Sequence, residues 1–208
     1  SSDLELLGVA AAIGQTAPAA PAVASAPALP TAWEFAKAPA IEGLSLSPDG
    51  SHMAAITSPD GITRYISIWE TANPDKAPVV LGASKMRLKG VSFIKNDRII
   101  AVAQQLFTAG STKTHLLKIY ITDLKGEKWT SALPEASTGS EDEQFADAVS
   151  NPSLLSDLPD DPNHVIVMKQ GLDGAGDVYK VDVYSGAIER IARASDRFGG
   201  PSVDRTGE

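Results

Sequence analysis

The chain has no cysteine and only three histidines among its 208 residues. Without cysteine it can form no disulfide bond, and it has neither a thiolate nucleophile nor a cysteine-ligated zinc site. Positive charge is also scarce: 18 Lys and Arg face 26 Asp and Glu, and the net charge of −8 argues against nucleic acid or an anionic membrane surface as a partner. The longest apolar run, LLGVAAAI at 6–13, is too short to span a membrane. What is present, with 43% hydrophobic residues, is a globular chain with room for one or two domains.

The first forty residues contain no Lys or Arg before Lys37, but they contain 14 Ala and 5 Pro. An apolar stretch followed by small residues, such as Ala22-Val23-Ala24, is similar to the second half of a secretory signal, although the basic beginning of such a signal is missing. A short helix is the alternative, because Ser2-Asp3-Leu4-Glu5 has the Ser-x-x-Glu form of a capping box. We expect residues 1–39 to form a helix and an Ala/Pro-rich linker or a residual signal region, in a periplasmic or secreted protein.

Short strands joined by tight turns follow this segment. The sequence LSLSPDGSHMAAI at 44–56 places a Ser-Pro-Asp-Gly turn between two apolar stretches. Pro48 suits the second position of a type I turn, Asp49 can bond its own backbone, and Gly50 tolerates the exit geometry. A second Ser-Pro-Asp-Gly turn at 58–61 leads into a strand at 65–69, and a further strand follows at 79–81. Four antiparallel strands with tight connections make a meander.

The same pattern of strands and turns recurs twice more. The aspartates of the corresponding turns, Asp49, Asp97 and Asp161, are 48 and 64 positions apart, and Asp204 follows 43 positions later. Four-stranded units of about 40–50 residues are typical of β-propeller blades, and an insertion at 134–145 explains the longer spacing. The sequence therefore predicts an all-β fold with a short N-terminal helix: a partial β-propeller at 40–208, with blades at about 40–83, 88–134 and 150–192 and the start of a fourth at 200–208. Three four-stranded antiparallel blades make an incomplete ring.

Several segments resemble the N-terminal propeller of the prolyl oligopeptidase family of serine peptidases. Residues 33–56 combine a Phe-x-x-x-Pro lead-in with the first Ser-Pro-Asp-Gly blade, and further similarity lies in LPDDPNHVIV at 158–167 and GDVYKVDVYSGAIERI at 176–191. The resemblance covers about residues 33–208 and is to bacterial members of the dipeptidyl and acylaminoacyl peptidase type. It implies a propeller that acts as a non-catalytic cap over a C-terminal α/β-hydrolase domain, which carries the Ser-Asp-His triad.

The chain itself contains no Gly-x-Ser-x-Gly sequence, the turn on which a hydrolase of that type presents its nucleophile. His52, His115 and His164 each fall at the start or in the interior of a predicted strand, where we expect structural roles. We therefore predict no catalytic residue, no metal and no cofactor. In the dipeptidyl peptidase branch of the family, paired glutamates of the propeller bind the α-amino group of the substrate. The resemblance thus makes Glu141 and Glu143 candidate substrate-binding residues, with a solvated charged loop as the alternative.

The predicted function is to gate the access of peptide substrates to a hydrolase domain that lies outside this sequence. The expected partners are that domain and unstructured peptides, and an oligomer is compatible with the sequence. A stand-alone TolB-like propeller that binds other molecules is the main alternative, because Ser-Pro-Asp-Gly blades also occur there; a polysaccharide lyase propeller is a third. An open arc of blades would leave two blade faces bare, so we also expect an apolar surface that needs more protein to cover it.

Overall fold

The computed structural model describes residues 29–83, 86–109, 112–134, 145, 149–171, 175–194 and 201–205. The chain divides into two units, 1–36 and 37–208. In the first unit the described helix is α1, Ala32–Ala36. A capping box begins it: Thr31 N and Thr31 Oγ1 donate to the Glu34 carboxylate at 2.6 and 2.9 Å, and Glu34 N donates to Thr31 Oγ1 at 3.3 Å. The helix expected after Ser2 lies outside the described residues, whereas α1 occupies part of the predicted linker.

In the second unit, the described residues form three four-stranded antiparallel sheets. The first sheet comprises β1 (Ile41–Leu46), β2 (His52–Thr57), β3 (Tyr65–Glu70) and β4 (Val79–Gly82), in that order across the sheet. The two Ser-Pro-Asp-Gly turns connect β1 to β2 and β2 to β3. The meander predicted from the sequence is confirmed.

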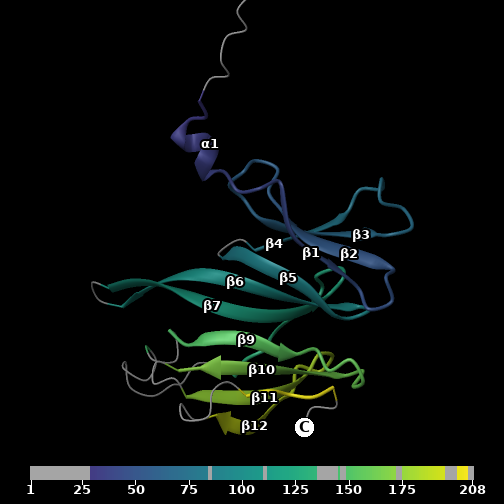
Figure 1. Cartoon of the computed structure of the whole chain (residues 1–208), viewed down its shortest axis with the longest axis vertical. Helices are drawn as coiled ribbons and strands as arrows, with labels where there is room; N and C mark the ends of the chain where they lie inside the picture. Colours follow the sequence, from purple (N-terminus) through teal and green to yellow (C-terminus); the bar gives the residue numbers. More distant parts are fainter. Residues whose placement is uncertain are drawn as a thin grey trace, which may run out of the picture. The chain divides into compact units, whose positions relative to one another are not determined.

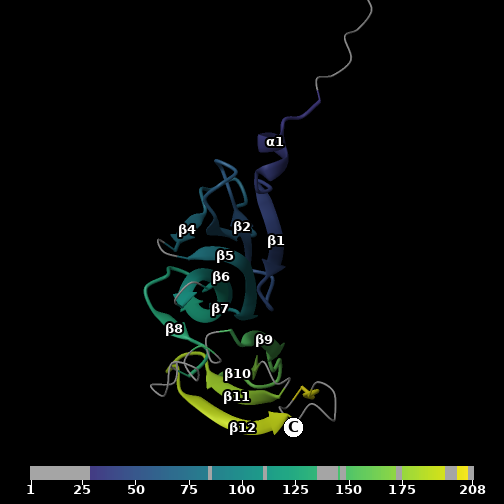
Figure 2. The same ribbon diagram turned by 90° about the vertical axis from the view of Figure 1, so that its left-hand side faces the viewer.

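The other two sheets repeat this arrangement, each with its strands in chain order. The second sheet comprises β5 (Arg87–Lys95), β6 (Arg98–Ala109), β7 (Thr112–Asp123) and β8 (Trp129–Ser131). The third comprises β9 (Asn151–Ser156), β10 (His164–Gln170), β11 (Gly176–Asp182) and β12 (Ile188–Ala194). The three sheets lie as successive layers in Figures 1 and 2. The predicted all-β class, with three sheets built like propeller blades, is therefore confirmed.

The core lies in the two spaces between neighbouring sheets, and the second sheet is buried on both faces. Alternate residues of β6 supply both spaces: Ile99 and Ala101 pack in the cluster between the first and second sheets, whereas Ile100 packs in the cluster between the second and third. This two-sided burial explains why β6 begins as a continuous apolar run rather than as an alternating one. The first cluster comprises Ala54, Ile56, Ile66, Ile68, Leu81, Leu88, Val91, Phe93, Ile99, Ala101 and Ala103. The second comprises Ile94, Ile100, Ile119, Ile121, Ala132, Leu133, Val165, Val167, Tyr179, Val181 and Val183.

The two outward faces of this stack differ. On β1 of the first sheet, Leu44 and Leu46 have 63% and 58% of their surface exposed. On the third sheet, Val203 packs against a buried cluster that includes Leu158 and Ile166. Residues 201–205 thus cover part of the third sheet, and Arg205 anchors them by donating from Nε and one terminal nitrogen to the Asp160 carboxylate, both at 3.0 Å.

In the second and third sheets, the turn between the third and fourth strands packs against the preceding sheet. One of these turns has the form Asp-x-x-Gly and the other Asp-x-x-x-Gly. After β7, Asp123 Oδ1 accepts a hydrogen bond from Lys125 N, and Gly126 follows with φ of 71°. After β11, Asp182 Oδ1 accepts from Tyr184 N, and Gly186 follows with φ of 82°. A Cβ at Gly126 would lie 2.8 Å from Leu81 Cδ2, and one at Gly186 would lie 2.4 Å from Thr130 Cγ2. Each glycine therefore serves both a left-handed turn and a close approach to the last strand of the preceding sheet.

The close approach at Gly186 can be separated from its backbone conformation by comparing two substitutions. Gly50 has a similar φ of 70°, but nothing lies within 4 Å of an added Cβ. We expect Gly50→Ala to cost about 1 kcal/mol of unfolding free energy, from the left-handed backbone alone. Gly186→Ala should cost roughly 1–3 kcal/mol more, because its methyl group meets the side chain of Thr130. Chemical denaturation of both variants measures the difference, and equal losses would show that the contact between sheets is unimportant.

Candidate functional site

The turns after the first and third strands of every sheet gather at one end of the second unit. Backbone hydrogen bonds tie neighbouring turns together: Thr71 N donates to Ser51 O at 3.0 Å, and Val183 N donates to Asn163 O at 2.8 Å. We call this group the turn end and define it as residues 47–51, 71–78, 95–98, 123–128, 157–163 and 183–187. It lies on the right of the sheets in Figure 1. Among the described residues, most of the polar contacts that join neighbouring sheets are made here.

The first Ser-Pro-Asp-Gly turn is organised around the carboxylate of Asp49. Ser47 Oγ donates to Asp49 Oδ1 at 2.6 Å, and Ser51 donates to the same oxygen from N at 2.9 Å and from Oγ at 2.8 Å. These hydrogen bonds, that from Ser47 first, lower the pKa of Asp49 from 3.8 to about 2. Asp49 N donates in turn to Asn96 Oδ1 at 3.0 Å, which links the turn to the second sheet.

The second and third sheets are joined at the turn end by the ammonium group of Lys95. Lys95 Nζ donates to three backbone carbonyls of the loop that follows β9: those of Asp157 (2.6 Å), Leu158 (3.0 Å) and Asp161 (2.6 Å). The lysine is only 9% exposed. Burial lowers the pKa of Lys95, while the charges of Asp157 and Asp161 act in the opposite direction. The side chain therefore acts as a buried cation that holds the loop in shape.

A second group of contacts flanks Lys95. The Arg98 guanidinium lies 4.5 Å from the ring centroid of Tyr184, and Tyr184 Oη donates to Asp97 Oδ1 at 3.0 Å. Lys128 Nζ donates to Tyr184 O at 3.0 Å. Burial, and then the hydrogen bond to Asp97, raise the pKa of Tyr184. The Arg98 guanidinium over the Tyr184 ring, and the Asp97 carboxylate that binds both side chains, thus fix the turn after β11 against the second sheet.

His164 lies among turn contacts. His164 Nδ1 lies 2.9 Å from Asp161 Oδ2, and Lys180 Nζ lies 3.2 Å from the same oxygen. Burial raises the pKa of Asp161, but hydrogen bonds from Asn163 N and from the His164 and Lys180 side chains outweigh it and hold this pKa well below its usual range. A carboxylate that is bound in this way holds a turn together.

Ser51, His52 and Asp49 contain the residue types of a serine hydrolase site, but their geometry does not match one. His52 Nδ1 lies 2.8 Å from Ser51 Oγ, and Ser51 Oγ donates to Asp49. In a triad the carboxylate instead orients the histidine through the ring nitrogen that does not contact the serine. Asp49 here bonds the serine, and the group lies exposed in a turn. The third histidine, His115, is exposed on β7.

Other residues singled out from the sequence have different outcomes. Glu141 and Glu143 lie outside the described residues, so their role remains a prediction. Between β10 and β11, Gly171 N donates to Ala175 O at 2.8 Å. Among the described residues, no group of three or more His, Asp or Glu side chains is arranged to hold a metal ion. No helix in the described part of the chain is both long and apolar enough to cross a membrane.

The main contacts of the turn end were not predicted from the sequence. Lys95 closes the strand segment VSFIK and, in the sequence, looks like any charged residue before a turn. A signal was nevertheless present for its partner: a turn was predicted at Asp161, and Leu158, three residues before it, adopts a left-handed φ of 47°. Such a backbone turns carbonyl groups to one side, where they need a donor.

Comparisons with known proteins identify no family for this chain. No protein-family model matches the sequence, and no curated protein matches it. Among solved structures, TolB from Acinetobacter baumannii matches with a TM-score of 0.43 and 15% identity, over 73% of this chain and 32% of that one. Acylaminoacyl peptidase in complex with Z-Gly-Gly-Phe-chloromethyl ketone gives 0.49 and 12%, over 74% of this chain and 25% of that one. A chain from a study of two prolyl endopeptidases gives 0.34 and 13%, over 74% and 26%.

The chain therefore spans between 25% and 32% of the length of the first two of these structures. The sequence identities are low, at 12–15%, and the TM-scores of these structures lie below 0.5. Such a likeness carries no conclusion about the activity of this chain.

Replacing Lys95 tests whether its ammonium group holds the second and third sheets together. We expect Lys95→Met to lower the free energy of unfolding by roughly 2–4 kcal/mol, because three carbonyl groups lose a charged donor. Lys76→Met is the control, since Lys76 pairs with Glu70 at 3.0 Å but its side chain is 66% exposed. That control should lose less than about 1 kcal/mol. Denaturant titration of the two variants decides, and similar losses would contradict the proposed role of Lys95.

The lowered pKa of Asp49 predicts a specific response to acid. Because the folded-state pKa of about 2 lies below the ordinary 3.8, the contribution of this carboxylate is fully present above about pH 4 and is lost as the pH falls towards 2. Ser47→Ala removes the largest cause of the shift, so the pKa of Asp49 should rise towards 3.8. Carboxyl-carbon NMR titration of the two proteins measures both values. An unchanged titration midpoint in the variant would show that Ser47 does not stabilise the charged form.

Proposed function

We propose that this chain is the propeller segment of a serine peptidase of the prolyl oligopeptidase type, and that its blades form a non-catalytic cap. The cap would control which peptides reach an α/β-hydrolase domain outside this sequence. The observation that carries the proposal is the segment at 33–56, where a Phe-x-x-x-Pro lead-in runs into a first blade built on a Ser-Pro-Asp-Gly turn. The later segments 158–167 and 176–191 add to the same resemblance.

The side chains with catalytic potential support a structural rather than a chemical role for this chain. The sequence offers no Gly-x-Ser-x-Gly turn for a nucleophile. The Ser47 hydroxyl, and then Ser51, lower the pKa of Asp49 by hydrogen bonding. Burial raises the pKa of Asp161, but hydrogen bonds from Asn163 N and from the His164 and Lys180 side chains outweigh it. A carboxylate with a lowered pKa is a weak base, because proton transfer near neutral pH is best served by a pKa near 7.

The contacts between sheets suit a cap that admits substrates by size. Three features each hold one sheet against its neighbour: the Lys95 ammonium group, the contacts of Tyr184 with Arg98 and Asp97, and the close approach at Gly186. A stack with such ties resists opening between its blades, so a folded protein would be excluded whereas an unstructured peptide would pass. Glu141 and Glu143 would then bind the peptide's α-amino group. We further propose that the protein is exported to the periplasm or beyond, in line with the Ala/Pro-rich beginning of the chain.

Labelling with a fluorophosphonate probe tests this function. Residues 1–208 alone should neither react with the probe nor cleave peptides, while the complete protein that contains them should do both. Removal of the blades should leave labelling of the hydrolase domain intact but allow cleavage of longer or folded substrates. Reaction of the 208-residue chain itself would mean that it holds a nucleophilic serine. A complete protein that is inactive and unlabelled would favour the alternative, a TolB-like binding propeller.

A further inference from the structure

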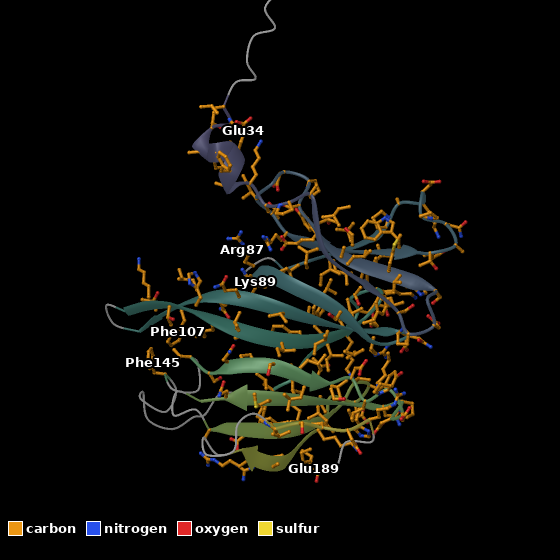
Figure 3. The ribbon with its side chains drawn as sticks, in the orientation of Figure 1. Glu34, Arg87, Lys89, Phe107, Phe145 and Glu189 are labelled. Atoms are coloured by element: carbon orange, nitrogen blue, oxygen red, sulfur yellow. The ribbon has the colours of Figure 1, made fainter. Side chains whose placement is uncertain are left out.

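The hairpin formed by β6 and β7 is longer than the rest of its sheet. Both strands have 12 residues, whereas β5 first pairs with β6 at Arg87 opposite Gln104, and β8 pairs with β7 only at 120–122. Within the described residues, no strand pairs with 105–109 on the β5 side. We call this segment the β6 free edge; the hairpin extends to the left in Figure 1, and Phe107 is labelled in Figure 3.

The strand register identifies which backbone groups are free. Ala132 N donates to Ile119 O at 2.9 Å, so the polar groups of Ile119 point away from β6 and towards β8. Because these directions alternate along an antiparallel strand, Thr114 and Leu116 bond β6, and their partners there are Phe107 and Gln105. On β6, Leu106 and Thr108 alternate with Gln105 and Phe107, so they do not bond β7. Their N–H and C=O groups therefore point outward along the free edge.

The β6 free edge is also the least protected edge in the described structure. Natural sheets guard their edges with short strands, bulges, charges or proline. β1 has a bulge between Glu42 and Ser45, β5 carries Arg87 and Lys89 beside a bulge, and β9 contains Pro152. β4 and β8 have only four and three residues. The outer strand β12 and the open edge of β7 carry charged or titratable side chains: Glu189, Arg190, Arg193, Lys113, His115 and Lys118. The sequence from Ile99 to Ala109 has no charge, proline or glycine.

The charge distribution favours a meeting of two copies at this hairpin. Between Asp97 and Asp123 the sequence contains no acidic residue, although the chain as a whole has a net charge of −8. The same stretch holds three basic residues, Arg98, Lys113 and Lys118, but the β6 free edge itself, 105–109, is uncharged. Two copies that pair along this edge therefore bring no like charges of the edge face to face. An extended peptide would find no charged anchor along the β6 free edge, whereas a second copy brings an equally neutral strand.

We propose that the β6 free edge pairs antiparallel with the same edge of a second copy, about a twofold axis at Phe107. In this register Leu106 faces Thr108 of the second copy, so the outward N–H and C=O groups of both residues bond reciprocally. Phe107 then lies opposite its own copy at a position without backbone bonds, where side chains approach most closely. Leu106, now 58% exposed, gains the side chain of Thr108 of the second copy as a cross-strand neighbour. Such pairing is self-complementary and closes at two copies.

Disulfide trapping tests the register in a chain that has no cysteine of its own. Residues opposite each other without backbone bonds have Cα atoms about 4.5 Å apart, within the range that a disulfide spans. Under mild oxidation, Phe107→Cys should form a covalent dimer of the whole chain. His115→Cys on the other edge of the hairpin is the matched control and should remain monomeric on a denaturing gel. Equal trapping of both variants, or none of Phe107→Cys, would overturn the proposal.

A proline variant tests the backbone pairing itself. Thr108→Pro removes an outward N–H that has no role in pairing β6 with β7, and it should reduce trapping of Phe107→Cys at least tenfold. His115→Pro makes the equivalent change on the β7 edge and should leave trapping unchanged, which separates the loss of pairing from loss of the hairpin. Leu106→Lys, which places a charge on the edge, should act like Thr108→Pro. If the chain stays monomeric but Thr108→Pro weakens its binding to extended peptides, the edge receives a peptide instead and the proposal is wrong.

Discussion

A sheet with two apolar faces is stable only if both faces are covered, and the second sheet of this protein is such a sheet. Ile99 and Ile100 are neighbours in sequence, yet they are buried in different clusters on opposite faces of β6. The first and third sheets therefore have to pack against it, and their relative positions are set by that requirement. The contacts of the turn end fix the remaining freedom, because apolar packing alone has little directional preference.

Lys95 shows how one sheet comes to depend on another. The loop at 157–161 directs three carbonyl oxygens at one point, and Leu158 takes up a left-handed backbone conformation there while being fully buried. Without a donor at that point the loop would carry buried acceptors with no partner, which is costly. The donor comes from the end of β5 in the second sheet. The shape of this loop in the third sheet thus requires the second sheet. The segment at 158–167, which resembles a peptidase family, therefore also has a role in packing.

Features that depend on residues close together in the sequence could be predicted from it, whereas contacts between sheets could not. The Ser-Pro-Asp-Gly turns were predicted correctly, because Ser47, Asp49 and Gly50 act within a few residues of one another. The blade at about 88–134 was predicted, but the extension of β6 and β7 beyond β5 was not, since their ends lie outside the packed faces that impose an apolar alternation. The Thr31 capping box has the same form as the one noted at Ser2 and was overlooked. Lys95 and Tyr184 act between sheets, so no local pattern revealed them.

The same distinction bears on how function is assigned to such a chain. Serine, histidine and aspartate occur together at 49–52, and an imidazole and a carboxylate pair again at His164 and Asp161. Residue type alone would suggest hydrolytic chemistry at either place. The hydrogen bonds decide otherwise. Asp49 accepts from Ser47 and Ser51 and does not orient the histidine, and Asp161 shares its carboxylate between His164, Lys180 and the backbone N–H groups of its own turn. These side chains therefore stabilise the turns in which they lie. A function that depends on shape, such as gating, agrees with side chains that are committed to holding that shape.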